Sequence, residues 1–129
     1  NGDSYIAFSV KTLLHFHISR QAETTILLSS GTRGTDYGNV ELDEDNRILS
    51  FQEKPQHFEG QLINAGVYCL QHELIRQQSE GKASIEREWF TQWIYSNRVF
   101  GMVLPKPFYD IGTRERFELA KQKLEQRIC

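Results

Sequence analysis

Two aspartates stand where an extended segment meets a turn, a position typical of ligand-binding carboxylates. Asp110 ends the short apolar run in "FYDIGTRERFELA", residues 108–120, and a Gly-Thr turn and a helical pattern follow it. Asp3 is the last residue of "NGD" at the start of the chain. In α/β sheets ligands bind beyond the carboxyl ends of strands, and Mg²⁺ takes one or two carboxylates together with substrate phosphates. Each aspartate alone is also explained as a turn residue whose oxygens accept backbone N–H groups.

Two further motifs carry polar side chains close to strand ends. In "FQEKP" the pair Glu53 and Lys54 ends a strand, where the carboxylate can accept from hydroxyls and the amine can meet a phosphate. In "INAGVY" Asn64 lies in an otherwise apolar strand beside the small residues Ala65 and Gly66. A buried asparagine needs hydrogen-bond partners, and a sugar hydroxyl or backbone groups would satisfy it. An ordinary solvated charge pair explains Glu53 and Lys54 equally simply.

Three other patterns are weak signals. The segments "GTRG", residues 31–34, and "GTR", residues 112–114, could suggest phosphate-binding loops. Neither matches the phosphate-binding patterns G-x-x-x-x-G-K-[ST] or G-x-G-x-x-G. His15 and His17 are two residues apart, so a helix would point them to different faces and a metal site there is not expected.

Composition sets the broad class. The 129 residues are 39% hydrophobic and 25% charged, which is typical of one soluble globular domain over 1–129. The net charge of −2 argues against nucleic-acid binding, and no apolar run reaches the ~20 residues of a membrane helix. Two cysteines, Cys69 and Cys129, without a Cys-x-x-Cys pair, indicate reduced thiols and a cytoplasmic location, with a disulfide between the two as the alternative.

The mixture of strand and helix patterns favours an α/β sheet. The expected elements are a helix over 9–20, capped by Ser9, strands over 24–30, 40–42, 48–51 and 63–70, helices over 72–78 and 84–97, strands over 99–104 and 108–111, and a helix over 113–124. The strands over 40–42 and 48–51 should form a hairpin around the polar turn "DEDNR". The Val10–Leu14 and Trp89–Trp93 faces of these helices are expected to form a partial core. The apolar residues at helical spacing, and so available to pack, are Val10, Leu13, Leu14, Ile18, Ile85, Trp89, Phe90, Trp93, Ile94, Phe117, Leu119, Ala120 and Leu124.

Taken in order, four motifs resemble the sugar-1-phosphate nucleotidyltransferases, also called NDP-sugar pyrophosphorylases. The motifs are "NGD", "YGNVELDEDNRILSFQEKP", "NAGVYCL" and "FYDIGTRERFELA", and they extend over essentially the whole chain. The resemblance implies a Rossmann-like mixed sheet flanked by helices, the nucleotide-diphospho-sugar transferase fold. It also implies a reaction in which a nucleoside triphosphate and a sugar 1-phosphate give an NDP-sugar and pyrophosphate. Because the sequence ends with the helix that follows "DIGT", it most resembles the guanylyltransferases for heptose 1-phosphate or mannose 1-phosphate.

By matching position, the resemblance gives roles to seven residues. Asp3 and Asp110 would be the Mg²⁺ ligands, and with Lys54, which would contact the sugar phosphate, they form the expected catalytic set. The expected substrate-binding residues are Gly38, Glu53, Lys54, Asn64 and Gly66, with Glu53 accepting from a sugar hydroxyl. Gly38, which follows Tyr37, would let the sugar approach the backbone.

One departure from the family pattern leads to an expectation about activity. Family members begin with a glycine-rich G-G-x-G-T-R loop that holds the triphosphate, and the "GTRG" at 31–34 follows "NGD" instead of preceding it. The chain therefore resembles the sugar-binding C-terminal portion, with the N-terminal part missing, and it should be inactive alone. The alternatives are a sugar-phosphate-binding module without catalysis and an assembly module, because a halved sheet exposes an edge strand that favours self-association into a homo-oligomer.

Overall fold

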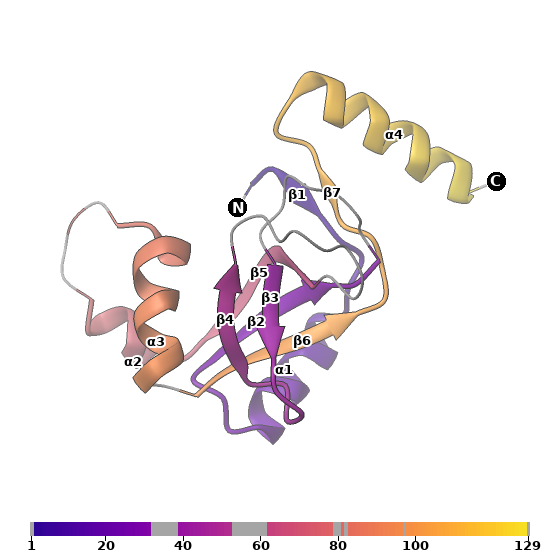
Figure 1. Ribbon diagram of the computed structural model, residues 1–129. Helices are drawn as coiled ribbons and strands as arrows, with labels where there is room; N and C mark the ends of the chain where they lie inside the picture. Colours follow the sequence, from indigo (N-terminus) through magenta and orange to yellow (C-terminus); the bar gives the residue numbers. More distant parts are fainter. Residues whose placement is uncertain are drawn as a thin grey trace.

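The computed structural model describes residues 2–31, 39–52, 62–78, 81, 83–96 and 98–128. Figure 1 shows a central five-stranded sheet, helices around it, and a two-stranded ribbon above its upper end. The elements are β1 (Ser4–Tyr5), α1 (Val10–Ser19), β2 (Thr24–Ser29), β3 (Asn39–Leu42), β4 (Ile48–Gln52), β5 (Ile63–Leu70), α2 (His72–Arg76), η1 (Ile85–Trp89), α3 (Phe90–Ser96), β6 (Val99–Leu104), β7 (Tyr109–Asp110) and α4 (Arg114–Ile128).

The strand order in the large sheet is β4-β3-β5-β2-β6. Strand β2 runs parallel to β6 and antiparallel to β5, so the sheet is mixed, as the family resemblance implies. The β3–β4 hairpin is also confirmed. Its turn is held by Asp43, whose Oδ1 accepts from the backbone N–H groups of Asp45 and Arg47 at 2.9 and 2.8 Å.

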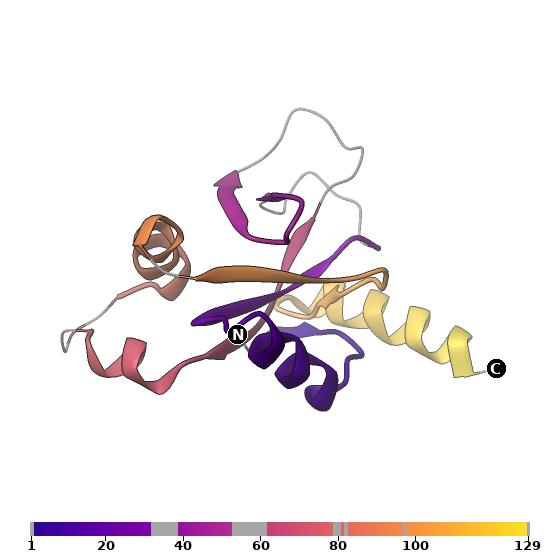
Figure 2. The ribbon, with the colours of Figure 1, turned by 90° about the horizontal axis from the view of Figure 1, so that it is seen from below.

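Strand β2 lies at the centre of the core and supplies both faces of the sheet. Ile26 and Leu28 belong to one buried cluster with Phe90, while Leu27 belongs to a second cluster with Leu13. This division follows from the two-residue period of a strand. Figure 2 shows the two sides, with α1 and the β3–β4 hairpin on opposite sides of β2 and β6. Full burial of such a side chain stabilises the fold by about 1.5–3 kcal/mol.

Helix α1 begins where the sequence predicts. Ser9 caps it, because its hydroxyl oxygen accepts from the Thr12 backbone N–H at 3.3 Å. Only one narrow face is buried, however, and the apolar residues Val10, Leu14 and Ile18 are 70%, 49% and 64% exposed. The expectation that the Val10–Leu14 face contributes to the core was therefore wrong for Val10 and Leu14. The buried Leu13 lies one residue, about 100° of helical rotation, from Leu14, so the stripe containing Leu14 faces away from the sheet.

The helix predicted over 84–97 has two parts. It opens with the π-helix η1 and continues as the α-helix α3. Ser84 caps its start, because its hydroxyl accepts from the Arg87 N–H at 3.2 Å. Phe90 and Trp93 are buried as predicted, at 0% and 4% exposure. The preceding helix, α2, ends at Arg76, two residues earlier than predicted.

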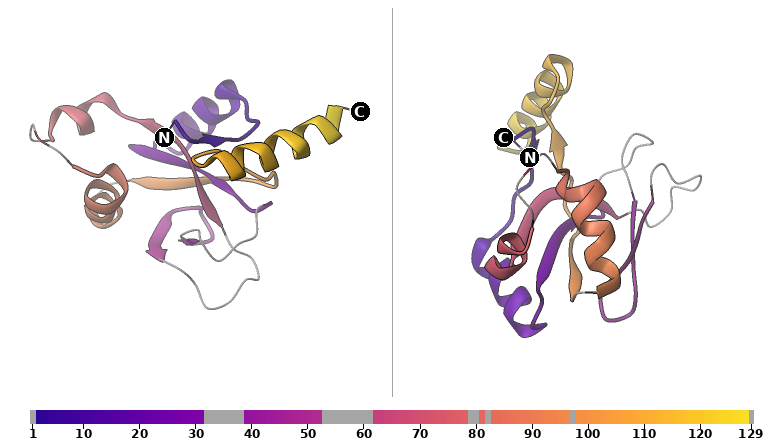
Figure 3. Two further views of the ribbon diagram at one scale, coloured as in Figure 1. Left: turned by 90° about the horizontal axis from the view of Figure 1, so that it is seen from above. Right: turned by 90° about the vertical axis from the view of Figure 1, so that its left-hand side faces the viewer.

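Helix α4 packs less than the sequence predicts. Thr113 caps it, accepting from the Arg116 N–H at 3.2 Å, and Ala120 is buried. Phe117 and Leu119, which their spacing makes available to pack, are 48% and 51% exposed. Figure 3 shows the reason, since α4 extends away from the large sheet and packs mainly against β7. Among the described residues, no helix combines the length and apolar character needed to cross a membrane.

Candidate functional site

The two-stranded ribbon places Asp3 beside Asp110. Strands β1 and β7 are antiparallel, with Ser4 opposite Asp110 and Tyr5 opposite Tyr109. The Ile111 N–H donates to the Asp3 carbonyl oxygen at 2.7 Å and extends the pairing beyond the strands. Stacking of Tyr5 on Tyr109, at 6.4 Å between ring centroids, adds a side-chain contact to the ribbon. The pairing brings Asp3, which precedes β1, close to Asp110 of β7, and Figure 1 shows this ribbon above the upper end of the large sheet.

The two carboxylates approach the same point beside Gly112. A Cβ atom added to Gly112 would lie 3.3 Å from Asp110 Oδ1 and 3.4 Å from Asp3 Oδ2. The glycine therefore leaves open the space that both oxygens border. This is a physical reason for glycine at a position whose φ lies outside the left-handed region.

Asp110 is the more constrained of the two carboxylates. Its Oδ1 accepts from the Gly112 N–H at 2.8 Å, and its Oδ2 accepts from the Arg116 guanidinium. The Asp110 side chain is 18% exposed and that of Arg116 is 43% exposed. Asp3 is exposed, and its Oδ1 accepts from the Ser4 hydroxyl at 3.4 Å. The first-turn cation of α4 therefore balances part of the negative charge that the two aspartates bring together.

The donor set fits Mg²⁺ better than a metal that needs an all-protein cage. The residues described by the structure contain no group of three or more His, Cys, Asp or Glu side chains placed to hold a metal ion. Two hard carboxylates with an open space between them suit a cation that completes its octahedron with waters and substrate phosphates. Asp3 and Asp110 are the residues that would hold it.

Strand β5 carries a bulge at the "NAG" motif. Ile26 and Leu28 of β2 stand opposite Tyr68 and Asn64, so two strand steps on β2 face four on β5. Gly66 has a φ of 73°, in the left-handed region that glycine adopts without strain. The two extra residues preserve the alternation of the strand, so Asn64 and Tyr68 remain on the same face. β5 is only partly buried along most of its length, although the sequence predicts a buried strand.

The side chains of Asn64, Tyr68 and Glu86 form a chain of hydrogen bonds. Asn64 Oδ1 accepts from the Gly66 N–H at 2.9 Å, and Asn64 Nδ2 donates to the Tyr68 hydroxyl at 3.2 Å. The Tyr68 hydroxyl donates to Glu86 Oε1 at 2.6 Å. Burial raises the pKa of Tyr68, and the hydrogen bond to Glu86 raises it further. The negative charge of Asp3 contributes in the same direction, which places this chain in the electrostatic reach of the aspartate pair.

Asn64 and Gly66 are predicted from the sequence as site residues, whereas their neighbours Tyr68 and Glu86 are not. Tyr68 reads as one more β-forming residue, and Glu86 reads as a solvated charge on a helix. Their separation of 18 residues gives no periodic signal. The remaining expected site residues, Gly38, Glu53 and Lys54, lie outside the described residues.

His15 and His17 face different ways, as their spacing predicts. His15 is exposed. His17 is 8% exposed, and its Nδ1 shares a hydrogen bond of 2.8 Å with the hydroxyl of Thr25 on β2. Burial lowers the pKa of His17. The imidazole is therefore part of the packing between α1 and the sheet.

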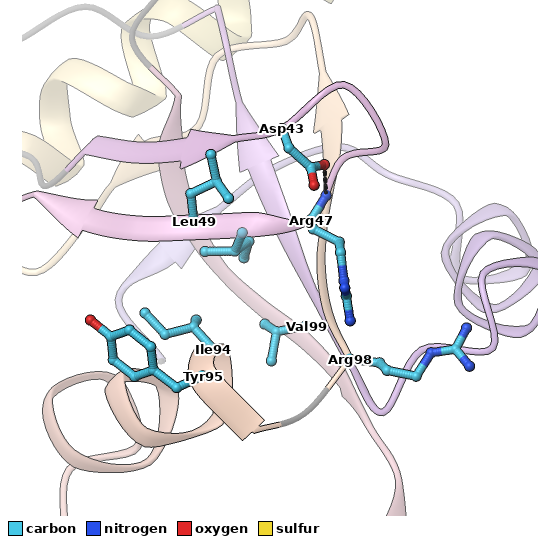
Figure 4. A pocket seen from close by; sticks show the side chains of 8 residues that line it. Asp43, Arg47, Leu49, Ile94, Tyr95, Arg98 and Val99 are labelled. Carbon is cyan, nitrogen blue, oxygen red and sulfur yellow. Dashed lines mark hydrogen bonds between the residues drawn. The ribbon is translucent and has the colours of Figure 1, made fainter.

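A cavity of about 250 Å³ lies at the turn end of the β3–β4 hairpin, between this turn and α3 (Figure 4). The two arginines that line it already have partners. Arg98 donates to the Arg20 carbonyl at 2.6 Å, and the Arg47 guanidinium lies 5.7 Å from the centre of the Phe100 ring. Figure 4 shows Arg98 pointing toward α1. This cavity lacks the paired carboxylates found beside Gly112, so it is not the candidate site.

The comparisons with known proteins define the family. Residues 1–127 match the family model described as "Nucleotidyl transferase", and the chain belongs to that family. It is 34% identical over 113 residues to the probable mannose-1-phosphate guanylyltransferase 3 of Arabidopsis thaliana, which covers 87% of this chain and 34% of that protein. It is 29% identical over 129 residues to the D-glycero-alpha-D-manno-heptose 1-phosphate guanylyltransferase of Aneurinibacillus thermoaerophilus, which covers 99% of this chain and 55% of that protein.

A solved structure confirms the fold. The crystal structure of HddC from Yersinia pseudotuberculosis superimposes with a TM-score of 0.81 at 25% identity, covering 96% of this chain and 53% of that one. A second crystal structure of HddC is complexed with GMP-PN and gives a TM-score of 0.77. The chain thus spans between about a third and about half of the length of these relatives.

Proposed function

We propose that this chain provides the metal and sugar-phosphate site of a sugar-1-phosphate nucleotidyltransferase. The reaction joins a nucleoside triphosphate to a sugar 1-phosphate, giving an NDP-sugar and pyrophosphate. The observation that carries the proposal is the approach of the Asp3 and Asp110 carboxylates to one point beside Gly112. Membership of the nucleotidyl transferase family supports it.

In this proposal the side chains position the substrate and balance its charge. An oxygen of the sugar phosphate attacks the α-phosphorus in line, the new P–O bond forms, and pyrophosphate leaves, so no protein nucleophile is required. Asp3 and Asp110 hold Mg²⁺, which supplies positive charge to the phosphates when bound. Lys54 contacts the sugar phosphate and Glu53 accepts from a sugar hydroxyl. Positioning and charge neutralisation together account for catalysis of this kind.

The sugar pocket in this proposal includes Gly38, Asn64 and Gly66. Asn64 lies on β5, which contacts β1, the strand that follows Asp3. The proposed substrates are mannose 1-phosphate or heptose 1-phosphate with guanosine triphosphate. Support for this choice comes from the names of the relatives, which are guanylyltransferases for those two sugar phosphates.

Calorimetric titration of the 129-residue chain with mannose 1-phosphate or heptose 1-phosphate tests the proposal. The expected result is binding that strengthens when Mg²⁺ is present, with the Mg²⁺ dependence lost in the variants D3N and D110N. Absence of Mg²⁺-dependent binding of either sugar phosphate would refute the proposal. With guanosine triphosphate added, the chain alone should form no GDP-sugar, because the triphosphate loop G-G-x-G-T-R of the family is not among these residues. Robust synthesis would refute the expectation that the chain alone is inactive.

An assembly module is the second candidate function. It is favoured by one observation, the exposure of Val10, Leu14 and Ile18 along one side of α1. Apolar stripes of this kind often mark protein–protein contacts. Light scattering after size-exclusion chromatography separates the candidates, because an assembly module should self-associate independently of Mg²⁺ and sugar phosphate. A monomer at all concentrations would exclude self-assembly.

A further inference from the structure

We propose that Glu86 is a positioning residue which, through the Tyr68 hydroxyl, fixes the orientation of the Asn64 side-chain amide. The consequence for sugar recognition rests on the proposed function, in which Asn64 lines the sugar pocket. The orientation itself is a property of the chain and can be measured without any ligand.

The argument begins with the direction of each hydrogen bond. An ionised glutamate can only accept, so the Tyr68 hydroxyl must give its single hydrogen to Glu86 at 2.6 Å. The hydroxyl oxygen is then left as an acceptor, and the group that reaches it at 3.2 Å must be a donor. That group is the Nδ2 of Asn64. The glutamate thus determines which end of the amide faces Tyr68.

The backbone of the bulge selects the same orientation. The Gly66 N–H donates to Asn64 Oδ1 at 2.9 Å. If the amide were turned by 180°, its NH₂ group would face the Gly66 N–H and its oxygen would face an acceptor, so two hydrogen bonds would be lost together. Without Glu86, Tyr68 could donate its hydrogen to the amide oxygen, and only the Gly66 contact would oppose the turn. Glu86 therefore strengthens the preference for this orientation, to which the Gly66 N–H also contributes.

The surroundings hold Tyr68 in the middle of this chain. The Phe90 ring meets the Tyr68 ring edge to face, with 5.0 Å between centroids. Glu86 and Phe90 are four residues apart at the start of the η1–α3 helix, and both contact Tyr68. A π-helical turn is uncommon and is often found at functional sites. This turn brings the Glu86 carboxylate to the hydroxyl of Tyr68 and the Phe90 ring to the Tyr68 ring.

A correctly oriented Asn64 amide offers one remaining N–H and one remaining lone pair on the oxygen. This pairing of a donor and an acceptor is suited to a sugar hydroxyl, which can both accept and donate. In the turned orientation the two positions would be exchanged, and the hydrogen bonds offered to a bound sugar would be mismatched. Glu86 would thereby influence sugar specificity without touching the sugar.

The variants E86A, E86Q and Y68F test the proposal, with E88A as the matched control. Glu88 belongs to the same π-helix, is exposed, and accepts from the Ser84 N–H, so its removal loosens the helix start without touching Tyr68. The first readout is nuclear magnetic resonance of the ligand-free chain, following the Overhauser contact between the Asn64 NH₂ and the Tyr68 ring. E86A and Y68F should weaken this contact, whereas E86Q, whose amide oxygen can still accept, and E88A should keep it. An unchanged contact in E86A would overturn the proposal, and so would an equal loss in E88A.

The second readout is affinity for mannose 1-phosphate with Mg²⁺. E86A and Y68F should each weaken binding about three- to tenfold, the effect of one lost hydrogen bond, and the double variant should lose little more than either alone. E86Q should bind within about twofold of the wild type. Full additivity in the double variant would contradict the shared chain. If the unmodified chain bound no sugar phosphate, the proposed function would fall, while the Overhauser contact would still decide the role of Glu86.

Discussion

Replacing Gly112 by alanine should impair metal binding without unfolding the chain. The added Cβ would lie 3.3 Å from Asp110 Oδ1 and 3.4 Å from Asp3 Oδ2, so one or both carboxylates must shift by a few tenths of an ångström. Mg²⁺ requires oxygen ligands at about 2.0–2.1 Å in near-ideal geometry. Losing one charged ligand costs about 1.5–3 kcal/mol. We therefore expect Mg²⁺ affinity to fall about ten- to hundredfold in G112A.

The assay is calorimetric titration of the chain with Mg²⁺, combined with urea unfolding to measure stability. The Gly112 backbone lies outside the left-handed region, so alanine introduces no backbone strain and slightly reduces the entropy of the unfolded chain. The free energy of unfolding should therefore change by less than about 1 kcal/mol. The matched control is G2A, since a Cβ added at Gly2 meets nothing within 4 Å. Equal Mg²⁺ affinity in G112A and the wild type would refute the reasoning.

Three other changes test separate parts of the structure. R116Q removes the guanidinium that pairs with Asp110, so that Asp110 is freer to bind the metal. The Mg²⁺ affinity should rise up to about fivefold, since exposed ion pairs are worth about 0.2–1 kcal/mol. A calorimetric Mg²⁺ affinity at or below that of the wild type would contradict this. Burial lowers the pKa of His17, so as the pH falls the imidazole is protonated in the unfolded chain at a higher pH than in the folded chain. The free energy of unfolding should therefore decrease as the pH falls below 6.5, the ordinary pKa of histidine. In thermal unfolding at several pH values, H17Q should flatten this dependence, whereas H15Q, at an exposed position, should not. F90A removes a fully buried ring and should lower the free energy of unfolding in urea by about 3–5 kcal/mol, and a loss below 1 kcal/mol would argue against the packing described.

Local patterns in the sequence were sufficient for most of the fold. The cap at Ser9, the turn held by Asp43 and the buried run of β2 each depend on residues close together in the chain, and all three are as predicted. Packing of the helices was harder to predict. The apolar spacing of α1 is helical, but it cannot say how wide a face the sheet covers, and Leu14 and Ile18 are exposed.

The candidate site depends on contacts between residues far apart in the sequence, which local patterns do not predict. The pairing of β1 with β7 joins the two ends of the chain, and no periodicity predicts it. The expectation that Asp3 meets Asp110 therefore came from resemblance to a family, and the paired strands now give it a geometric basis. Glu86 was missed because its partner Tyr68 lies on a strand 18 residues away and the contact depends on a π-helical turn.

The most direct measurement of the central claim locates the metal by paramagnetic broadening. Mn²⁺, which accepts the same hard oxygen ligands as Mg²⁺, would be added in small amounts to the isotopically labelled chain. The account predicts that the backbone amide signals of residues 3–5 and 110–112 broaden first, and that excess Mg²⁺ restores them. Broadening centred on other residues, or none that Mg²⁺ reverses, would contradict the assignment of Asp3 and Asp110 as the metal site.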